Sequence, residues 1–139
     1  KKKYGTGTYA DGMPLEDATA SLGGSDNTKD VIQYEKLKAE YAANEIVNAE
    51  RVGSGLKVDP THRAASYVSE SQLAQGRVFS FTGGDNSSYT LLQTKGGLDG
   101  INGIYEYILN IKGQVTHQRF ITGGQITGFA NQKVPIGGY

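Results

Sequence analysis

From Arg77 onward the chain consists of short segments rich in β-branched and aromatic residues, separated by turns that contain glycine. The segments are 77–82, 89–94, 103–111, 114–121 and 125–129, and the turns between them include Gly83-Gly84-Asp85-Asn86, Lys95 to Gly100, Lys112-Gly113 and Gly123-Gly124. With 20 glycines in 139 residues, the chain can make many tight turns. This spacing predicts an antiparallel meander of five strands.

The part of the chain before Arg77 has the periodicity of helices. Apolar residues recur at steps of three to five residues, at Val31, Tyr34, Leu37, Tyr41 and Ile46. They predict a helix that begins at Asn27 or Thr28, ends at Gly53 and Gly55, and packs this stripe against the core. The pair Asp59-Pro60 predicts a second helix to about Val68, capped by Asp59, and residues 69–75 predict a short third one. We therefore expect an α+β fold with N-terminal helices packed on one face of a twisted antiparallel β-sheet.

Composition and charge vary along the chain. Residues 1–26 are rich in Gly, Thr, Ser and Asp and are expected to form a linker or loosely ordered arm. The net charge is zero, but residues 1–59 carry eight Lys and Arg against ten Asp and Glu, whereas residues 60–139 carry six against four. Any binding of nucleic acid would therefore depend on a local basic patch.

Both histidines of the chain lie beside an arginine, in Thr61-His62-Arg63 and in Thr116-His117-Gln118-Arg119. An imidazole exchanges protons near neutral pH, and a guanidinium matches phosphate oxygens with a planar fork. Two such pairs indicate a general base, a general acid and two anion ligands, which is what a ribonuclease needs to act without a metal. The alternative is that both pairs are ordinary surface residues.

Strand periodicity places His117 and Arg119 on the same face of segment 114–121, about 7 Å apart. The neighbouring strand offers Tyr105 and Tyr107, which are suitable platforms for unpaired RNA bases unless they simply pack in the core. Other chemistries have weaker support, because Asp85, Asp99 and Glu106 are scattered and the serines lack a nucleophile-elbow pattern. We expect no metal and no cofactor. The absence of cysteine excludes disulfides and thiolate chemistry, and no apolar run has membrane-spanning length.

Several segments resemble the C-terminal toxin domains of bacterial polymorphic toxins, in particular those of CdiA-type contact-dependent growth inhibition effectors. They are Asp59 to Val68, Leu91 to Lys95, Gly103 to Ile108 and Val115 to Gly124, within residues 58–133. The most specific is the stretch Thr116-His117-Gln118-Arg119-Phe120-Ile121 with Gly123-Gly124. The resemblance implies a small ribonuclease of the colicin D and barnase/EndoU/RelE class. It also implies two parts of the chain: residues 1–57, a linker and helical segment that ends an entry region or forms a neck, and residues 58–139, the ribonuclease toxin domain. The boundary motif Val-Glu-Asn-Asn that usually opens such toxin regions is missing.

The resemblance also implies roles for individual residues. His117 and His62 would exchange protons while tRNA is cleaved to a 2′,3′-cyclic phosphate, although a site with one histidine and a lysine is an alternative. Arg119 and Arg63 would hold the phosphate charge with help from Lys95. Thr116 or Thr122 would orient an imidazole or bind a phosphate oxygen.

The expected partners are the tRNA substrate, a cognate immunity protein and a translation factor such as EF-Tu, with no stable membrane association. The domain would be secreted at the cell surface as part of a large effector and would act in the cytoplasm of the target cell. Two rival functions remain open: a non-catalytic adhesin or nucleic-acid-binding module, and a metal-dependent DNase toxin.

Overall fold

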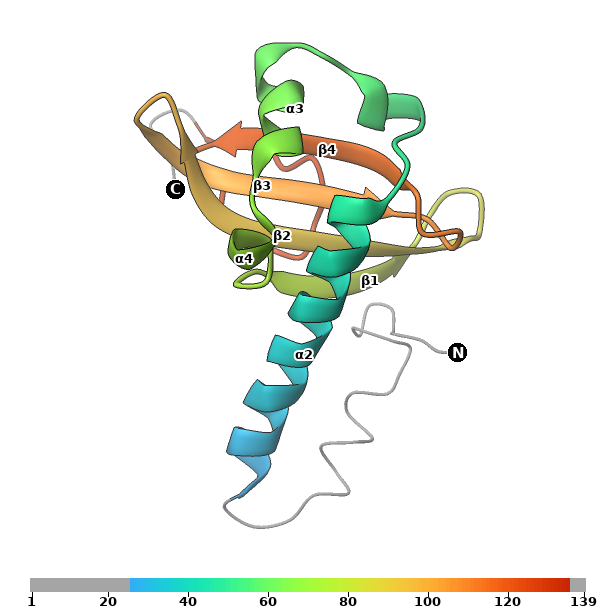
Figure 1. Cartoon of the computed structure of the whole chain (residues 1–139), viewed down its shortest axis with the longest axis vertical. Coiled ribbons are helices and arrows are strands. Elements are labelled where there is room, and N and C mark those ends of the chain that lie inside the picture. The colour runs from blue at the N-terminus through green and yellow to red at the C-terminus, as the bar shows by residue number, and fades with distance from the viewer. Residues whose placement is uncertain (1–25, 136–139) are drawn as a thin grey trace.

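The four strands within residues 26–135 form one antiparallel sheet in the order β1-β2-β3-β4 (Figure 1). The structure is a computed structural model that describes residues 26–135, with side chains from Asp30 onward. Its elements are α2 (Asp26–Asn48), the 3-10 helix η1 (Gly53–Leu56), α3 (Pro60–Ala64), the 3-10 helix η2 (Ala65–Tyr67), α4 (Glu70–Leu73), β1 (Arg77–Thr82), β2 (Ser88–Leu98), β3 (Ile101–Leu109) and β4 (Val115–Thr122). The predicted α+β class with an antiparallel sheet is confirmed.

Strand β2 continues to Leu98, beyond the predicted end at residue 94, and β3 begins at Ile101 instead of Gly103, because the turn between them has only two residues. The predicted end of β3 at Ile111 is wrong, because the strand ends at Leu109. Asp99 and Gly100 both have positive φ, at 53° and 80°, as a tight hairpin turn requires. The strand residues 95–98 and 101–102 therefore continue the ladder from Lys95 opposite Ile104 to Leu98 opposite Ile101. The sequence Asp-Gly is a strong turn signal, and it also sets the register of β2 against β3.

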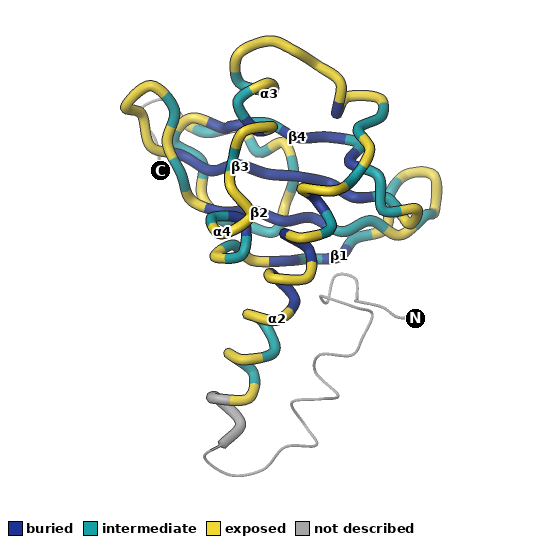
Figure 2. The backbone as a smooth tube through the Cα atoms, in the orientation of Figure 1, coloured by how far each residue is buried: buried dark blue, intermediate teal, exposed yellow. Residues whose placement is uncertain are grey.

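Helix α2 packs on the sheet through alanines and Ile46, which is the one residue of the predicted apolar stripe that is buried. Ala39, Ala42, Ala43 and Ile46 are buried in the core, whereas Leu37 and Tyr41 of the stripe are 52% and 65% exposed. Alanine lets the helix backbone approach the sheet closely, which turns the larger side chains outward. Figure 2 shows that the buried part of α2 is its C-terminal half. The predicted caps Asn27 and Thr28 lie outside the described side chains.

Helix α3 also differs from its prediction. Pro60 is the first residue of the helix, as expected, but the Asp59 side chain makes no capping hydrogen bond. The helical stretch runs from Pro60 to Tyr67, close to the predicted end at about Val68, but its last three residues form the 3-10 helix η2. The short helix α3 lies along the outer edge of β4 (Figure 1).

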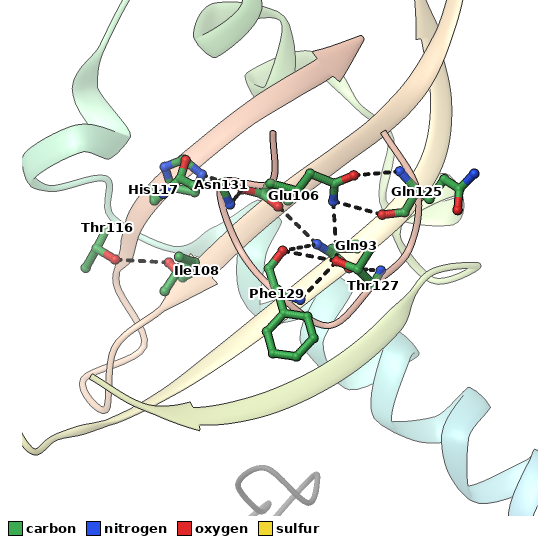
Figure 3. A network of polar contacts seen from close by, with 10 residues as sticks. Gln93, Glu106, Ile108, Thr116, His117, Gln125, Thr127, Phe129 and Asn131 are labelled. Carbon is green, nitrogen blue, oxygen red and sulfur yellow. Dashed lines mark hydrogen bonds and ion pairs between the residues drawn. The ribbon is translucent and has the colours of Figure 1, made fainter. Parts of the chain in front are cut away.

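The helices cover one face of the sheet, and the chain after β4 covers the other. The predicted strand 125–129 is absent, because its backbone groups bond to side chains and not to a neighbouring strand. Thr127 N–H and Gly128 N–H both donate to Gln93 Oε1, and Gln93 Nε2 donates to the Phe129 carbonyl. The segment 125–131 is called the C-terminal loop below. It lies against the middle strands of the sheet (Figure 3).

Helix α2, which lies before residue 58, and the sheet contribute to the same hydrophobic core. The cluster of buried residues joins Ala39, Ala42 and Ile46 of α2 to residues of the strands such as Tyr107 and Leu92. A functional division after residue 57 stays a prediction. The predicted linker 1–26 lies outside the described residues, except for Asp26, which is the first residue of α2. Within residues 26–135, no helix is both long and apolar enough to cross a membrane.

Candidate active site

The two histidines, far apart in the sequence, lie side by side in the structure. The ring centroids of His62 and His117 are 6.3 Å apart, and the rings meet edge to face at 86°. His117 is on β4, the edge strand, and His62 is on α3, which runs along the outer side of that strand. Both side chains are mostly buried, with 12% exposure for His62 and 11% for His117. The expectation that both imidazoles belong to one site therefore has geometric support.

His117 is held by a fully buried carboxylate, Glu106, on the neighbouring strand β3 (Figure 3). The His117 Nε2 atom lies 2.9 Å from Glu106 Oε2. The same carboxylate accepts hydrogen bonds from the Asn131 N–H at 2.9 Å and from Gln93 Nε2 at 3.1 Å. Burial raises the pKa of Glu106, but these three hydrogen bonds outweigh it, so the pKa lies below its ordinary value. An ionised carboxylate only accepts hydrogen bonds, so the proton is on Nε2 and the Nδ1 atom of neutral His117 is free to act as a base.

His62 is held by Asp59, three residues earlier in the same short helical segment. The His62 Nδ1 atom lies 2.8 Å from Asp59 Oδ1, and the Thr61 hydroxyl donates to Asp59 Oδ2. The hydrogen bond from the His62 ring is the main cause that lowers the pKa of Asp59. Asp59 thus orients an imidazole through its Nδ1 atom, which leaves the Nε2 atom of His62 available.

A buried glutamine on β4 fixes α3 at this edge of the sheet. Gln118 Nε2 donates to the Ser66 hydroxyl at 2.7 Å and to the His62 carbonyl at 3.4 Å. Its Oε1 atom accepts from Arg51 Nε, while Arg51 Nη1 donates to the Ile46 and Ala49 carbonyls at the end of α2. Gln118 therefore connects the end of α2, strand β4 and the helix that carries His62.

The two predicted arginines contribute unpaired guanidinium groups. Arg119 follows His117 by two residues on the same face and lies opposite Glu106. Its Nε atom is buried, and no residue between 26 and 135 accepts a hydrogen bond from it. Arg63 is exposed next to His62, and its side chain makes no hydrogen bond or ion pair with residues 30–135. A buried guanidinium N–H without a protein acceptor is suited to bind an anion.

Three other predicted residues lie away from the two rings. The Thr116 hydroxyl donates to the Ile108 carbonyl at 3.4 Å, at an irregularity in the pairing of β3 with β4, so it does not orient an imidazole. Thr122 is exposed at the other end of β4, about 17 Å along the strand from His117. Lys95 shares the His117 face but lies opposite Ile104, about 13 Å along the strands and two strands across from His117. It lines a separate cleft with Gly96, Asn102, Gly103, Gly123, Gly124, Gln125 and Ile126.

The two tyrosines cannot serve as base platforms in this structure. Tyr105 and Tyr107 face the helices and are 5% and 0% exposed. Their hydroxyls donate to the Gly97 carbonyl at 2.8 Å and to the Ala65 carbonyl at 2.6 Å. Burial raises the pKa of the Tyr107 hydroxyl far above its usual range. Their predicted role in substrate binding is therefore replaced by packing in the core.

The carboxylates Asp59 and Glu106 are the members of the site that sequence reasoning missed. A signal for each was present: Asp59 precedes His62 by three residues, which is one helical turn. The hairpin at Lys112-Gly113 places His117 opposite Ile108, so that Glu106 lies diagonal to His117 on the same face. Gln93 and Gln118 carried no such signal, because their partners come from distant segments.

The residues that the structure describes contain no cluster of three or more His, Cys, Asp or Glu side chains that could hold a metal ion. No protein-family model matches the chain, and neither a curated protein nor a solved structure does. The case for a function therefore depends on the residues and geometry of the site.

Proposed function

We propose that this protein is an endoribonuclease that cleaves RNA by transphosphorylation at the site of His62 and His117. The observation that carries the proposal is the convergence of these two rings, 6.3 Å apart, each hydrogen-bonded to its own carboxylate. A histidine oriented by a carboxylate is a common arrangement for a group that moves protons. The nearby guanidinium of Arg119, with no acceptor among the described residues for its buried Nε–H, supplies a ligand for a phosphate.

The proposed reaction uses one imidazole as base and the other as acid. The base takes the proton from a ribose 2′-hydroxyl, whose oxygen attacks the adjacent phosphorus. The bond from phosphorus to the 5′-oxygen breaks, and the protonated imidazole gives its proton to that oxygen. The products are a 2′,3′-cyclic phosphate and a 5′-hydroxyl. The available atoms are Nδ1 of His117 and Nε2 of His62, while Arg119 and Arg63 hold the negative charge of the pentacovalent phosphorus.

We further propose that this activity is that of an antibacterial toxin domain that cleaves tRNA, similar to CdiA-type effectors of the barnase/EndoU/colicin/RelE-like class. The α+β fold with one antiparallel sheet is compatible with that class. The proposal includes a cognate immunity protein and a translation factor such as EF-Tu as partners. It also includes secretion as part of a larger effector and action in the target-cell cytoplasm.

The decisive experiment incubates the purified protein with bacterial tRNA in the presence of EDTA. We expect cleavage that EDTA does not slow, and termini that carry a 2′,3′-cyclic phosphate detectable by mass spectrometry. Loss of cleavage on chelation, restored by magnesium, would support the alternative of a metal-dependent nuclease, and DNA would then be tested as substrate. Binding of tRNA without any cleavage would support a nucleic-acid-binding module.

A further inference from the structure

A second surface on the same face of the sheet as His117 is aromatic. It consists of Phe79, Phe81, Tyr89 and Phe129, which we call the aromatic ledge. Phe79 lies opposite Leu91, Leu91 opposite Ile108 and Ile108 opposite His117, so that Phe79 and His117 share one row across the sheet. Residues directly opposite each other project from the same face. Three strand spacings separate the two ends of this row by about 14 Å.

The rings of the ledge are arranged for stacking. Phe81 and Tyr89 are parallel to within 15°, with centroids 5.4 Å apart, and both are half-buried. Phe129 is 76% exposed, and in Figure 3 its ring points away from the cluster around Gln93. Its backbone is nevertheless held in place, since Gln93 binds the Phe129 carbonyl and the two preceding residues. A rigidly presented, exposed aromatic ring is available to a ligand at little cost in conformational entropy.

The two ends of the aromatic ledge carry opposite charges. The Arg77 guanidinium lies over the Phe79 ring, 5.2 Å from its centroid, at the end of the ledge nearer to the row of Gln93, Glu106 and Arg119. At the opposite end, Asp85 accepts a hydrogen bond of 2.6 Å from the Tyr89 hydroxyl. A phosphate is therefore favoured at Arg77 and disfavoured beyond Tyr89.

We propose that the aromatic ledge stacks unpaired bases of the RNA whose scissile phosphate lies at His117, so that the substrate is a single-stranded or looped segment. Aromatic rings beside a cation bind splayed bases of any sequence, whereas the bases of a duplex do not expose their faces. The inference rests on the proposed ribonuclease function, but the ledge can be tested separately, because it lies about 14 Å from the histidines.

The binding experiment uses His117→Ala protein, which we expect to cleave at least about 10²-fold more slowly, and a fluorescent 12-nucleotide RNA. We expect Phe129→Leu to weaken binding of the single strand at least fivefold, because stacking on an aromatic ring dominates such binding. Phe129→Trp should keep the affinity, and the control Tyr41→Leu, which removes a ring 65% exposed on α2, should change it less than twofold. The same RNA in a perfect duplex should bind more weakly than the single strand. Equal binding of the duplex, or no effect of Phe129→Leu, overturns the inference.

The cleavage experiment keeps His117 and compares two substrates. A dinucleotide is too short to reach the ledge, so Phe129→Leu should cleave it at the wild-type rate. For the 12-nucleotide RNA, the same change should raise KM at least fivefold and leave kcat unaltered. If the wild-type protein cleaves neither RNA while binding still depends on Phe129, the ribonuclease proposal fails and the ledge remains a binding site. If cleavage depends on His117 but Phe129→Leu changes KM for neither substrate, the ledge proposal fails and the ribonuclease proposal stands.

Discussion

At the scale of single residues, the two carboxylates of the candidate site hold their imidazoles in different surroundings. Glu106 is fully buried and satisfied by three donors, whereas Asp59 is half exposed and bonded within one helical turn. Loss of Glu106 therefore leaves buried donors without an acceptor, while loss of Asp59 exposes its partners to water. The structure links His117 to the stability of the fold and His62 to a local turn.

Replacement of His117 by alanine should lower RNA cleavage by about 10²-fold or more, the range for removing a positioned acid or base. His117→Gln, which can still donate to Glu106, should lose as much activity while preserving the fold by circular dichroism. His62→Ala distinguishes a site with two catalytic histidines from a site with one. Thr122→Ala, at the far end of the same strand, serves as the control. Wild-type cleavage by both histidine variants would show that the reaction occurs elsewhere.

Glu106→Gln should lower the free energy of unfolding by about 1–3 kcal/mol at pH 7, since an amide offers fewer acceptors to the buried donors around it. The pKa of Glu106 is lowered in the folded protein. Its contribution is therefore complete above the unfolded pKa of about 4.3 and is lost as the pH falls through the lower folded value.

Urea unfolding at pH 7 and at pH 3 should accordingly show a smaller gap between wild-type and Glu106→Gln protein at the lower pH. The control is Glu40→Gln on the exposed side of α2, which should change the stability by less than about 0.5 kcal/mol at either pH. A gap that stays constant or widens in acid would contradict the ionised, hydrogen-bonded state of Glu106.

At the scale of elements, the far face of the sheet depends on a loop and not on a fifth strand. One side chain, Gln93, replaces the ladder that a strand would form: it accepts from Thr127 and Gly128 and donates to Phe129 and Glu106. The loop in turn brings the Asn131 N–H to Glu106. The order of the C-terminal loop and the orientation of His117 are therefore coupled.

Gln93→Met, which keeps the volume and removes every polar atom of the side chain, should release this loop. We expect a loss of about 1–3 kcal/mol in the free energy of unfolding, because buried partners lose their hydrogen bonds. Amide hydrogen exchange should become faster at Thr127 and Gly128 while β3 stays protected. Gln75→Met, at an exposed position after α4, is the matched control. Unchanged exchange at Thr127 would mean that other contacts hold the loop.

At the scale of the whole molecule, two cations of a chain with zero net charge lie near the edge of the sheet that carries the histidines. Arg63 and Arg119 flank the two histidines there, while the described N-terminal half of α2 carries Asp30, Glu35, Lys36 and other charges of both signs. Attraction for an anionic partner is therefore local, and at this edge it comes from two guanidinium groups that lie near the carboxylates of Asp59 and Glu106.

A cognate immunity protein should bind this edge with nanomolar affinity or better, which corresponds to at least about 12 kcal/mol. Its carboxylates would meet Arg119 and Arg63, since complementary charge speeds association. We expect the protein to co-purify with the product of the adjacent gene, and that product to stop tRNA cleavage at a ratio of one to one. Arg119→Glu should weaken the complex and make association slower.

Two outcomes would alter the proposal of an immunity partner. Full cleavage at saturating partner would remove its inhibitory role. Inhibition by a partner that contacts residues 1–57 alone would replace direct occlusion of the site with binding at a distance.

Local sequence was sufficient for the features that depend on neighbouring residues. Strand alternation placed His117 and Arg119 on one face, and Pro60 marked the first residue of α3. The antiparallel meander followed from turn residues, because backbone sterics at Gly and Asp act within a few positions. The helix periodicity located α2 but not its buried side, since large apolar residues were favoured over the alanines that pack.

Only the tertiary structure decided which distant side chains meet. The contact of His62 with His117, the bonds of Glu106 to Gln93 and Asn131, and the burial of the tyrosines all depend on packing between separate segments. Periodicity specifies the face from which a side chain projects, but not what covers that face. A buried carboxylate can be satisfied by a strand, a glutamine or a loop, and the packing of the whole chain selects among them.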